Sequence, residues 1–537
     1  MSESKMIDKE KIAKSSLKMS LVTTVSRIFG LLRDQIQAAL LGTTFIADAF
    51  AIGFMLPNLL RRLFAEGNMV ASFIPVFTEL EKEKGSEESK KFFRAVFTLL
   101  GLILIGIVLI GIIISPLLVK ILYKSADNNM QALNLAADLS RIMFPYLFFI
   151  SLAALMQGVL NIRGYYSISA ASPILLNAVI ILSALFFKFF LPNFFSNMSY
   201  VFAFAVLLGG FVQFSYQMPF VYKQGFSFKP YFNFKEPYVI KMIKLFAPGI
   251  FGASIYQINL LVSTAFAGAI GEGRVSAVTF ATRIHEFVLG VFAVSVATVM
   301  LPTLSRLIAD NKKDEAVETL AYSLRLVALI TIPSAFGFMV LGKEIVRMIF
   351  EYGAFSSKST YLVSSALRYL SVSLFFVASY RILVQSFYAM KDMKTPVYTA
   401  FFAFIINAFS NYLCVYIFKF DIMGISISSV IANIVSFCIL YILLMKRMAV
   451  KSIINKKIEI IKTLAASLFM AASVYGAKYY LLSNAADSRL FFIFKVFIVI
   501  LFGMISYSLI NIILKNDDFV SFINMFKGKL LRKFIKK

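Results

Sequence analysis

The sequence has little charge: only 15% of its 537 residues are Asp, Glu, Lys or Arg, whereas 59% are hydrophobic and the mean hydropathy is +0.81. This composition lies outside the range of soluble domains. The apolar runs are also too long for an outer-membrane barrel, whose strands alternate every second residue over about ten residues. The composition therefore predicts an all-α polytopic membrane protein.

Residues that build metal, redox and catalytic sites are scarce. The two cysteines, Cys414 and Cys438, lie in apolar runs, which favours small core residues over a disulfide or a metal pair. The single histidine, His285, is better interpreted as a polar residue with hydrogen-bond partners than as a proton carrier. The sequence contains no nucleotide-binding loop, zinc motif or Ser/His/Asp set. We therefore expect no enzymatic activity, no cofactor and no ATP-driven pump.

Acidic residues are few relative to basic ones: 54 Lys and Arg against 28 Asp and Glu give a net charge of +26. In a soluble protein this excess would suggest nucleic acid. Here it is better explained by orientation in the bilayer, because basic residues accumulate on the cytoplasmic side. Residues 1–18 contain lysines but lack the short apolar core of a cleavable signal. We expect a retained cytoplasmic amino terminus and no nucleic-acid partner.

A helix needs roughly 20 apolar residues to cross the hydrocarbon, and the sequence offers fourteen such windows. Seven are free of charge or nearly so, and seven are shorter or interrupted by charges. The clear windows are 95–119, 142–162, 164–187, 189–222, 245–271, 395–418 and 422–445. The weaker windows are about 17–41, 44–80, 276–305, 316–342, 361–390, 460–482 and 490–514.

The loops between these windows alternate between basic and nearly uncharged, which supports an even number of spans with both termini in the cytoplasm. The loops at 42–44 and 191–199 contain no Lys or Arg. The basic segments contain Lys82, Lys84, Lys90, Lys91 and Arg94; Lys223, Lys229, Lys235, Lys241 and Lys244; Lys446, Arg447, Lys451, Lys456, Lys457 and Lys462; and a tail with Lys515, Lys527, Lys529, Arg532, Lys533, Lys536 and Lys537.

The two halves of the chain show a weak internal repeat, as many transporters do. Ile74 and Pro75 end an apolar stretch, as Leu301 and Pro302 do in the second half. At the same offset, residues 157–169 and 384–396 each join two apolar spans through a short basic turn. The predicted organisation is a tail (1–16), two six-helix lobes (17–224 and 225–450), a helix pair (451–516) and a basic cytoplasmic tail (517–537).

Charged residues inside predicted spans are functional candidates, because a charge at mid-bilayer costs about 2.5–3.5 kcal/mol on insertion scales. They cluster in the first, second and eighth spans. These residues are Arg27, Arg33 and Asp34; Asp48, Arg61, Arg62 and Glu66; and Arg283, His285 and Glu286. At 100° per residue, Arg27 and Asp34 share a helix face and Arg33 lies about 120° away. Alternatively, Arg62–Glu66 and Arg283–Glu286 are intrahelical pairs, and Arg61 or Arg62 snorkels at the cytoplasmic edge.

Pairing leaves a surplus of arginine in this set, and arginine favours bidentate contacts with phosphate or carboxylate. The sequence therefore predicts a wet cavity that holds an anionic head group. Pro57, Pro75 and Pro302 interrupt the second and eighth spans and are candidate hinges, although structural kinks at proline are at least as common.

Several of these segments resemble the MurJ (MviN) family of lipid II flippases. The resemblance covers nearly the whole chain, is most specific over 26–75, and is limited to hydropathy in the last two spans. The matching segments are Ser26–Asp34, Ala47–Phe50, Leu56–Gly67, Ser72–Pro75, Phe144–Tyr146, Ala281–Phe287, the Leu301–Pro302 turn, Tyr352–Phe355 and Asp392–Pro396.

This resemblance implies two lobes that form a V around a central cavity in the bacterial inner membrane. The implied substrate is lipid II, the undecaprenyl-pyrophosphate-linked disaccharide pentapeptide of peptidoglycan synthesis, and cell-wall synthesis proteins are further expected partners. Arg27, Arg33, Arg61 and Arg283 would then bind the diphosphate. Asp34, Asp48 and Glu66, together with Arg62 and Glu286, are assigned to the cavity or to gating. The last two helices would form a groove for the lipid tail.

One feature departs from the family. Relatives that couple to a cation use acidic and amide groups of the second lobe, whereas the corresponding spans here offer Ser263, Asn407 and Asn411 without a carboxylate. The membrane potential is then the expected driving force. The alternative functions are export of another polyprenyl-linked glycan or of drugs, and a membrane scaffold that recruits cell-wall enzymes without transport.

Overall fold

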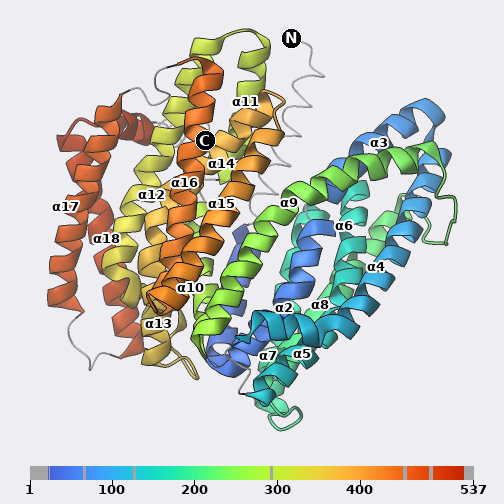
Figure 1. Cartoon of the computed structure of the whole chain (residues 1–537), viewed down its shortest axis with the longest axis horizontal. Helices are drawn as coiled ribbons and strands as arrows, with labels where there is room; N and C mark the ends of the chain where they lie inside the picture. Colours follow the sequence, from blue (N-terminus) through green and yellow to red (C-terminus); the bar gives the residue numbers. More distant parts are fainter. Residues whose placement is uncertain are drawn as a thin grey trace, which may run out of the picture. The chain divides into compact units, whose positions relative to one another are not determined.

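The computed structural model describes residues 22, 24–64, 68–124, 129–290, 294–450, 456–482 and 488–524, and this part of the chain contains helices but no strand (Figure 1). The all-α prediction is confirmed. Residues 24–41 and 517–524 are helical. The other helices are α2 (Phe45–Phe64), α3 (Asn68–Lys84), α4 (Ser86–Leu122), α5 (Met130–Met143), α6 (Tyr146–Ile162), α7 (Tyr166–Phe190), α8 (Met198–Lys223), α9 (Pro237–Ile270), α10 (Arg274–Val288), α11 (Val294–Ala309), α12 (Lys313–Phe350), α13 (Ser357–Leu370), η3 (Ser371–Ser373), α14 (Leu374–Ala389), α15 (Lys394–Tyr412), η4 (Leu413–Ile417), α16 (Ile422–Met448), α17 (Lys457–Leu481) and α18 (Arg489–Ile513).

Ten helical segments of the described chain are long and apolar enough to cross a membrane. Two of them combine consecutive helices: Met130–Ile162 contains α5 and α6, and Ser357–Ala389 contains α13, η3 and α14. The helix over 24–41 and α2 are absent from this set because each carries three charges. The count of fourteen spans therefore stays a prediction. Four predicted windows are open: 17–41, 44–80 and 276–305, which hold the candidate arginines, and 245–271, which lies mainly in α9.

The described chain forms two compact units. The first unit extends to Ser276 and includes Tyr352–Phe355, and the second unit contains the remainder. The first unit takes in α9, which packs against α2, α3 and α4, although the sequence repeat places the start of the second lobe at residue 225. The helix pair α17 and α18 packs on α12 within the second unit. A compact unit need not coincide with a duplicated segment, so the lobe boundaries remain predictions.

The order of helices repeats along the chain with the offset that separates Pro75 from Pro302. The starts of α4 and α12 differ by this same offset, and so do both the starts and the ends of the 14-residue helices α5 and α13. The starts of α7 and α15 depart from it by a single position. Matched helix lengths and spacings support a duplication that residue identity alone barely shows.

Close helix packing in the first unit depends on glycine at two adjacent positions of α8. A Cβ atom at Gly209 would overlap the Leu176 side chain of α7, and one at Gly210 would overlap the ring of Tyr146 on α6. Because neither glycine carries a side chain, α8 approaches both neighbours closely (Figure 1). The contact between Gly209 and Leu176 sets the axial position of α7 relative to α8. It thereby also places Asn177, the residue that follows Leu176.

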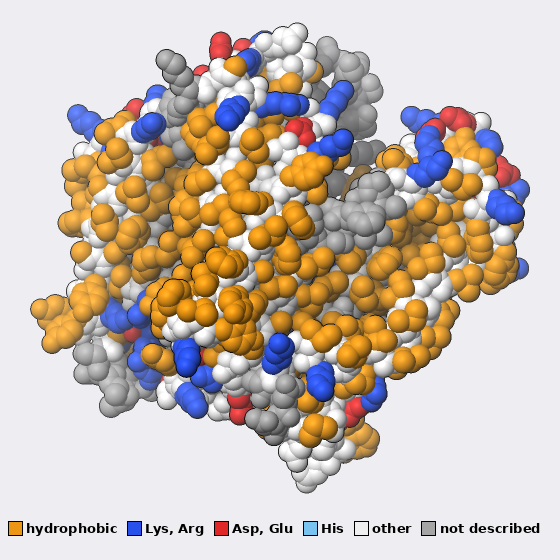
Figure 2. All heavy atoms as spheres, in the orientation of Figure 1, with side chains coloured by type: hydrophobic (Ala, Val, Ile, Leu, Met, Phe, Trp, Pro, Cys, Tyr) orange, Lys and Arg blue, Asp and Glu red, His pale blue; other side chains and the backbone are white. Residues whose placement is uncertain are grey.

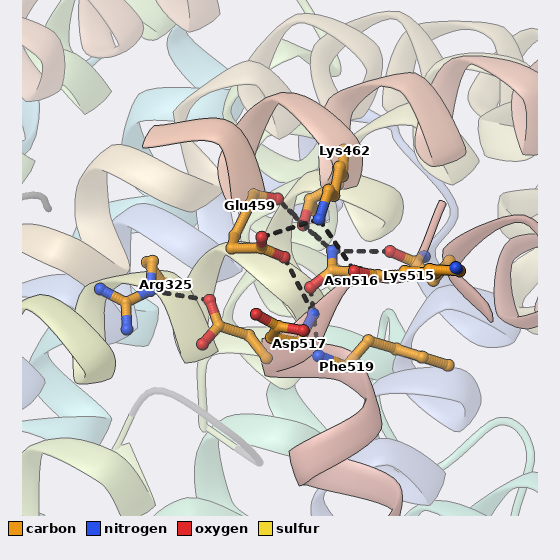
Figure 3. A network of polar contacts seen from close by, with 10 residues as sticks. Arg325, Glu459, Lys462, Lys515, Asn516, Asp517 and Phe519 are labelled. Carbon is orange, nitrogen blue, oxygen red and sulfur yellow. Dashed lines mark hydrogen bonds and ion pairs between the residues drawn. The ribbon is translucent and has the colours of Figure 1, made fainter. Parts of the chain in front are cut away.

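In the second unit, a polar network holds the segment that directly follows α18 (Figure 3). Arg325 Nε of α12 donates to Asp518 Oδ2 at 2.7 Å, and both side chains are buried. Lys462 Nζ donates to Glu459 Oε1 at 2.8 Å, and the Asp517 backbone N donates to Glu459 Oε2 at 2.9 Å. These contacts attach the segment after α18 to both α12 and α17.

The outer surfaces of the helices are apolar, as expected for contact with lipid. Figure 2 shows hydrophobic side chains along the sides of the helices and Lys and Arg toward their ends. Cys414 is buried, as predicted, but Cys438 is exposed on α16, so its prediction as a core residue was wrong. Hydropathy does not separate these positions, because a side chain that faces lipid is as apolar as one in the core.

Candidate substrate-binding site

The helix over 24–41 places two of the predicted arginines within the first unit. Arg33 is largely buried, with a side-chain exposure of 16%. Its Nη2 and Nε atoms donate to Asp34 Oδ1 at 2.7 and 3.1 Å, and its Nη1 donates to Asn177 Oδ1 of α7 at 3.1 Å. Helical spacing put Asp34 on the face of Arg27. The long Arg33 side chain nevertheless reaches the carboxylate of its own chain neighbour.

Arg27 lies nearly two turns earlier on the same helix and is half-buried. It makes no hydrogen bond or ion pair with any residue that the structure describes. A partly buried guanidinium without a partner is costly in a membrane protein, because charge is stabilised there by pairing or by water. The site therefore includes a cation that is available to an anionic ligand.

The end of α2 supplies two further arginines, both half-buried. Arg61 Nε donates to Asn58 Oδ1 at 3.0 Å, one turn earlier on the helix. The Nε atom of Arg62 is buried and has no hydrogen-bond partner in the described chain. Glu66 lies outside the described residues, so the predicted Arg62–Glu66 pair lies outside them as well.

Asp48, near the start of α2, is fully buried and holds a distant segment of the first unit. Its Oδ2 accepts from the backbone N of Gly273 at 2.5 Å, and its Oδ1 accepts from the backbone N of Ser276 at 2.7 Å. The hydroxyl of Tyr123 lies 3.5 Å from Oδ2. Asp48 thus caps the first turn of α10, which begins at Arg274. In this conformation the carboxylate is enclosed by protein, and a gating role stays a prediction.

Glycine permits this cap to form. Gly273 adopts a φ of +81°, and a Cβ atom there would overlap the carbonyl oxygen of Thr43. The Phe45 backbone N also donates to Glu272 Oε1 at 2.9 Å. Gly273 and Ser276 were not among the predicted site residues, because a contact made by backbone N–H groups leaves no side-chain pattern.

In the second unit, α10 carries the remaining candidates. His285 is buried, and its Nε2 lies 3.2 Å from Ser373 Oγ, as expected for a satisfied polar residue. Arg283 is half-buried and interacts with another residue. Glu286 is half-buried and pairs with no described residue, so the alternative of an intrahelical Arg283–Glu286 pair does not apply to this conformation.

The three candidate hinge prolines all lie inside helices. Pro57 is buried within α2, whereas Pro75 in α3 and Pro302 in α11 are exposed. The predicted span 44–80 consists of two helices, α2 and α3, separated by residues outside the described chain. The structure describes one conformation, and the hinge roles stay predictions.

The structure also describes Ser263, Asn407 and Asn411, the polar residues that the sequence analysis placed in the second lobe. Asn411 Nδ2 donates to Asn407 Oδ1 at 3.1 Å, and both residues are buried on α15. Ser263 belongs to α9 in the first unit. No group of three or more His, Cys, Asp or Glu residues able to hold a metal ion occurs in the described residues.

Comparison with known proteins shows which family this chain is similar to. The family model described as "Lipid II flippase MurJ" matches residues 37–501. A "Probable lipid II flippase MurJ" of Buchnera aphidicola subsp. Acyrthosiphon pisum is 32% identical over 464 residues, which cover 86% of this chain and 90% of that protein. The "Lipid II flippase MurJ" of Burkholderia cenocepacia is 32% identical over 403 residues, covering 74% of this chain and 77% of that protein.

Solved structures agree. A structure described as "Lipid II flippase MurJ, inward closed conformation" matches with a TM-score of 0.75 and 28% identity, covering 92% of this chain and 99% of that chain. An inward-facing multidrug resistance MATE transporter of the MOP superfamily matches with a TM-score of 0.64 at 14% identity, covering 81% of this chain and 98% of that chain, which shows a common fold alone. The chain therefore belongs to the MurJ family of lipid II flippases.

Proposed function

We propose that this chain moves lipid II from the inner to the outer leaflet of the bacterial cytoplasmic membrane, with its arginines holding the diphosphate. The observation that carries the proposal is that the first unit contains guanidinium N–H groups with no acceptor among the described residues. Arg27 has no hydrogen-bond or ion-pair partner among the described residues. Guanidinium groups match the geometry of phosphate oxygens and are less strongly hydrated than ammonium groups. A diphosphate head group would supply the missing acceptors.

Four residues are assigned to the diphosphate: Arg27, Arg33 and Arg61 of the first unit and Arg283 of the second. Binding of the diphosphate would drive a rearrangement, provided that one arrangement of the protein binds it more tightly than the other. Alternating access follows: the arginines capture the head group from the cytoplasmic leaflet, and a second arrangement releases it outside. Pro57, Pro75 and Pro302 are the proposed hinges, and Asp48 is the proposed gate contact.

The membrane potential is the proposed energy source. Moving one elementary charge across 100 mV is worth about 2.3 kcal/mol, and an inside-negative potential favours outward passage of an anion. Both termini are proposed to lie in the cytoplasm, since the segments after α8, α16 and α18 are rich in Lys and Arg. Cell-wall synthesis proteins are proposed partners because they would consume the released precursor.

The test is a flipping assay on full-length protein with Arg27→Ala, Arg283→Ala and the matched control Arg306→Ala. Arg306 is exposed on α11 and belongs to neither proposed arginine set. Lost transport in the first two variants, with normal membrane insertion and a normal control, supports the proposal. Unchanged transport in both would remove the proposed site. Depletion of the protein in cells should make lipid II accumulate, whereas another glycan carrier would accumulate a different polyprenyl-linked precursor.

A further inference from the structure

The geometry assigns Asn177 of α7 as the residue that positions Arg33 for the ligand, an inference that rests on the proposed function. A guanidinium has five N–H groups. Asp34 Oδ1 accepts two of them and Asn177 Oδ1 accepts a third, so within the described chain two of the five remain for an anion. These contacts therefore fix the orientation of the Arg33 guanidinium and still leave N–H groups that can bind a ligand.

Asn177 itself is firmly placed. It is buried, with 6% exposure, and directly follows Leu176, the residue on which Gly209 packs. Toward the start of α7, Ser172 Oγ accepts from Gln217 Nε2 of α8 at 3.2 Å. Gly209, Gln213 and Gln217 lie at successive four-residue intervals and so share the α8 face toward α7. Because these contacts fix α7, the Asn177 oxygen has little freedom to leave the guanidinium.

The Asn177 side chain carries no charge, and this is as important for anion binding by Arg33 as its position. Asp34 already contributes one negative charge to Arg33 at 2.7 Å. A second carboxylate at position 177 would neutralise the cation further and repel a phosphate, whereas an amide oxygen orients the guanidinium without adding charge. One carboxylate and one amide therefore make Arg33 rigid and leave it attractive to an anion.

The experiment measures binding of purified lipid II to full-length protein in detergent for Asn177→Leu, Asn177→Asp and the control Gln217→Leu. Asn177→Leu should weaken binding roughly tenfold, the factor that corresponds to one lost hydrogen bond to a charged group. Asn177→Asp keeps the shape and the acceptor and should weaken binding at least as much. Gln217→Leu removes a buried amide from the same helix pair and should lower the unfolding temperature with little change in affinity.

A purely structural role predicts a different pattern, in which Asn177→Asp binds like the parent protein and loss of affinity follows loss of thermal stability. That pattern would overturn the inference. In an Arg33→Ala background, Asn177→Leu should have no additional effect on affinity, and an independent effect there would also contradict it. Arg27→Ala and Arg283→Ala serve as reference variants. If these two variants bind lipid II normally, the proposed function fails. If only the Asn177 variants bind lipid II normally, the positioning role alone fails.

Discussion

Asp48 Oδ1 accepts a hydrogen bond from the backbone N of Ser276 at 2.7 Å, although the two residues are 228 positions apart in the chain. The same carboxylate accepts from Gly273, so a single buried side chain holds the first turn of α10 against the start of α2. Breaking this contact is a precondition for moving these segments apart, which is why Asp48 is the proposed gate residue.

Asp48→Asn should destabilise this arrangement by about 1–3 kcal/mol, the cost of leaving a buried polar group unsatisfied. The amide has one acceptor oxygen, and its NH₂ group would face a backbone N–H that now has no acceptor. Thermal unfolding of the full-length protein measures the effect, and Asp310→Asn, at an exposed position after α11, is the control. Equal unfolding temperatures for the two variants would contradict the structural role of Asp48.

Gly273→Ala should weaken the same contact from the opposite side. The residue would have to keep a φ of +81° while its Cβ overlaps the Thr43 carbonyl, and the left-handed conformation alone costs roughly 1–2 kcal/mol. Gly476→Ala is the matched control, because a Cβ there meets nothing within 4 Å and alanine favours the helix. The prediction is a lower unfolding temperature and reduced transport for the first variant alone.

The buried pair of Arg325 and Asp518 makes a separate prediction about the second unit. Removing one partner leaves an uncompensated buried charge, so Asp518→Asn or Arg325→Met should each cost about 3–5 kcal/mol. Replacing both by apolar residues (Arg325→Met with Asp518→Leu) should recover much of that loss, because the pair itself contributes little net stability. Thermal unfolding of the three variants tests this, and a double variant as unstable as the sum of the singles would refute it.

Asp392, in the turn between α14 and α15, predicts a pH-dependent contribution to stability. Hydrogen bonds from the Thr395 and Lys394 backbone N atoms and the Thr395 hydroxyl lower the pKa of its carboxyl, aided by Arg447. A carboxyl whose pKa is lower in the folded state stabilises the fold above its unfolded pKa of about 3.9, and this contribution is lost as the pH falls through the folded value.

Asp392→Ala should therefore reduce the free energy of unfolding by about 1 kcal/mol at neutral pH, as for loss of a helix cap. The difference from the parent protein should shrink below about pH 4. Unfolding measured across a pH series checks this, and a difference that stays constant into the acid range would show that the carboxylate is not the stabilising form.

The sequence was sufficient to predict the helical class, the internal offset and the segments that hold the arginines, because each depends on composition or spacing. It did not reveal Asn177, since a single neutral amide in an apolar span carries no periodic signal. It did not reveal the partners of Asp48 either, because those donors are backbone N–H groups that lie far away along the chain. The pairing of Arg33 with Asp34 depends on side-chain length and rotamer, which helical angles do not describe.

The most direct test of the arginine site is a competition measurement on the full-length protein, in which labelled lipid II is displaced by undecaprenyl pyrophosphate or by undecaprenol. The account predicts displacement by the diphosphate and little by the alcohol, with binding of labelled lipid II itself strongly weakened in Arg27→Ala and Arg33→Ala. Equal displacement by the two competitors, or lipid II affinity that is unchanged in both arginine variants, would contradict it.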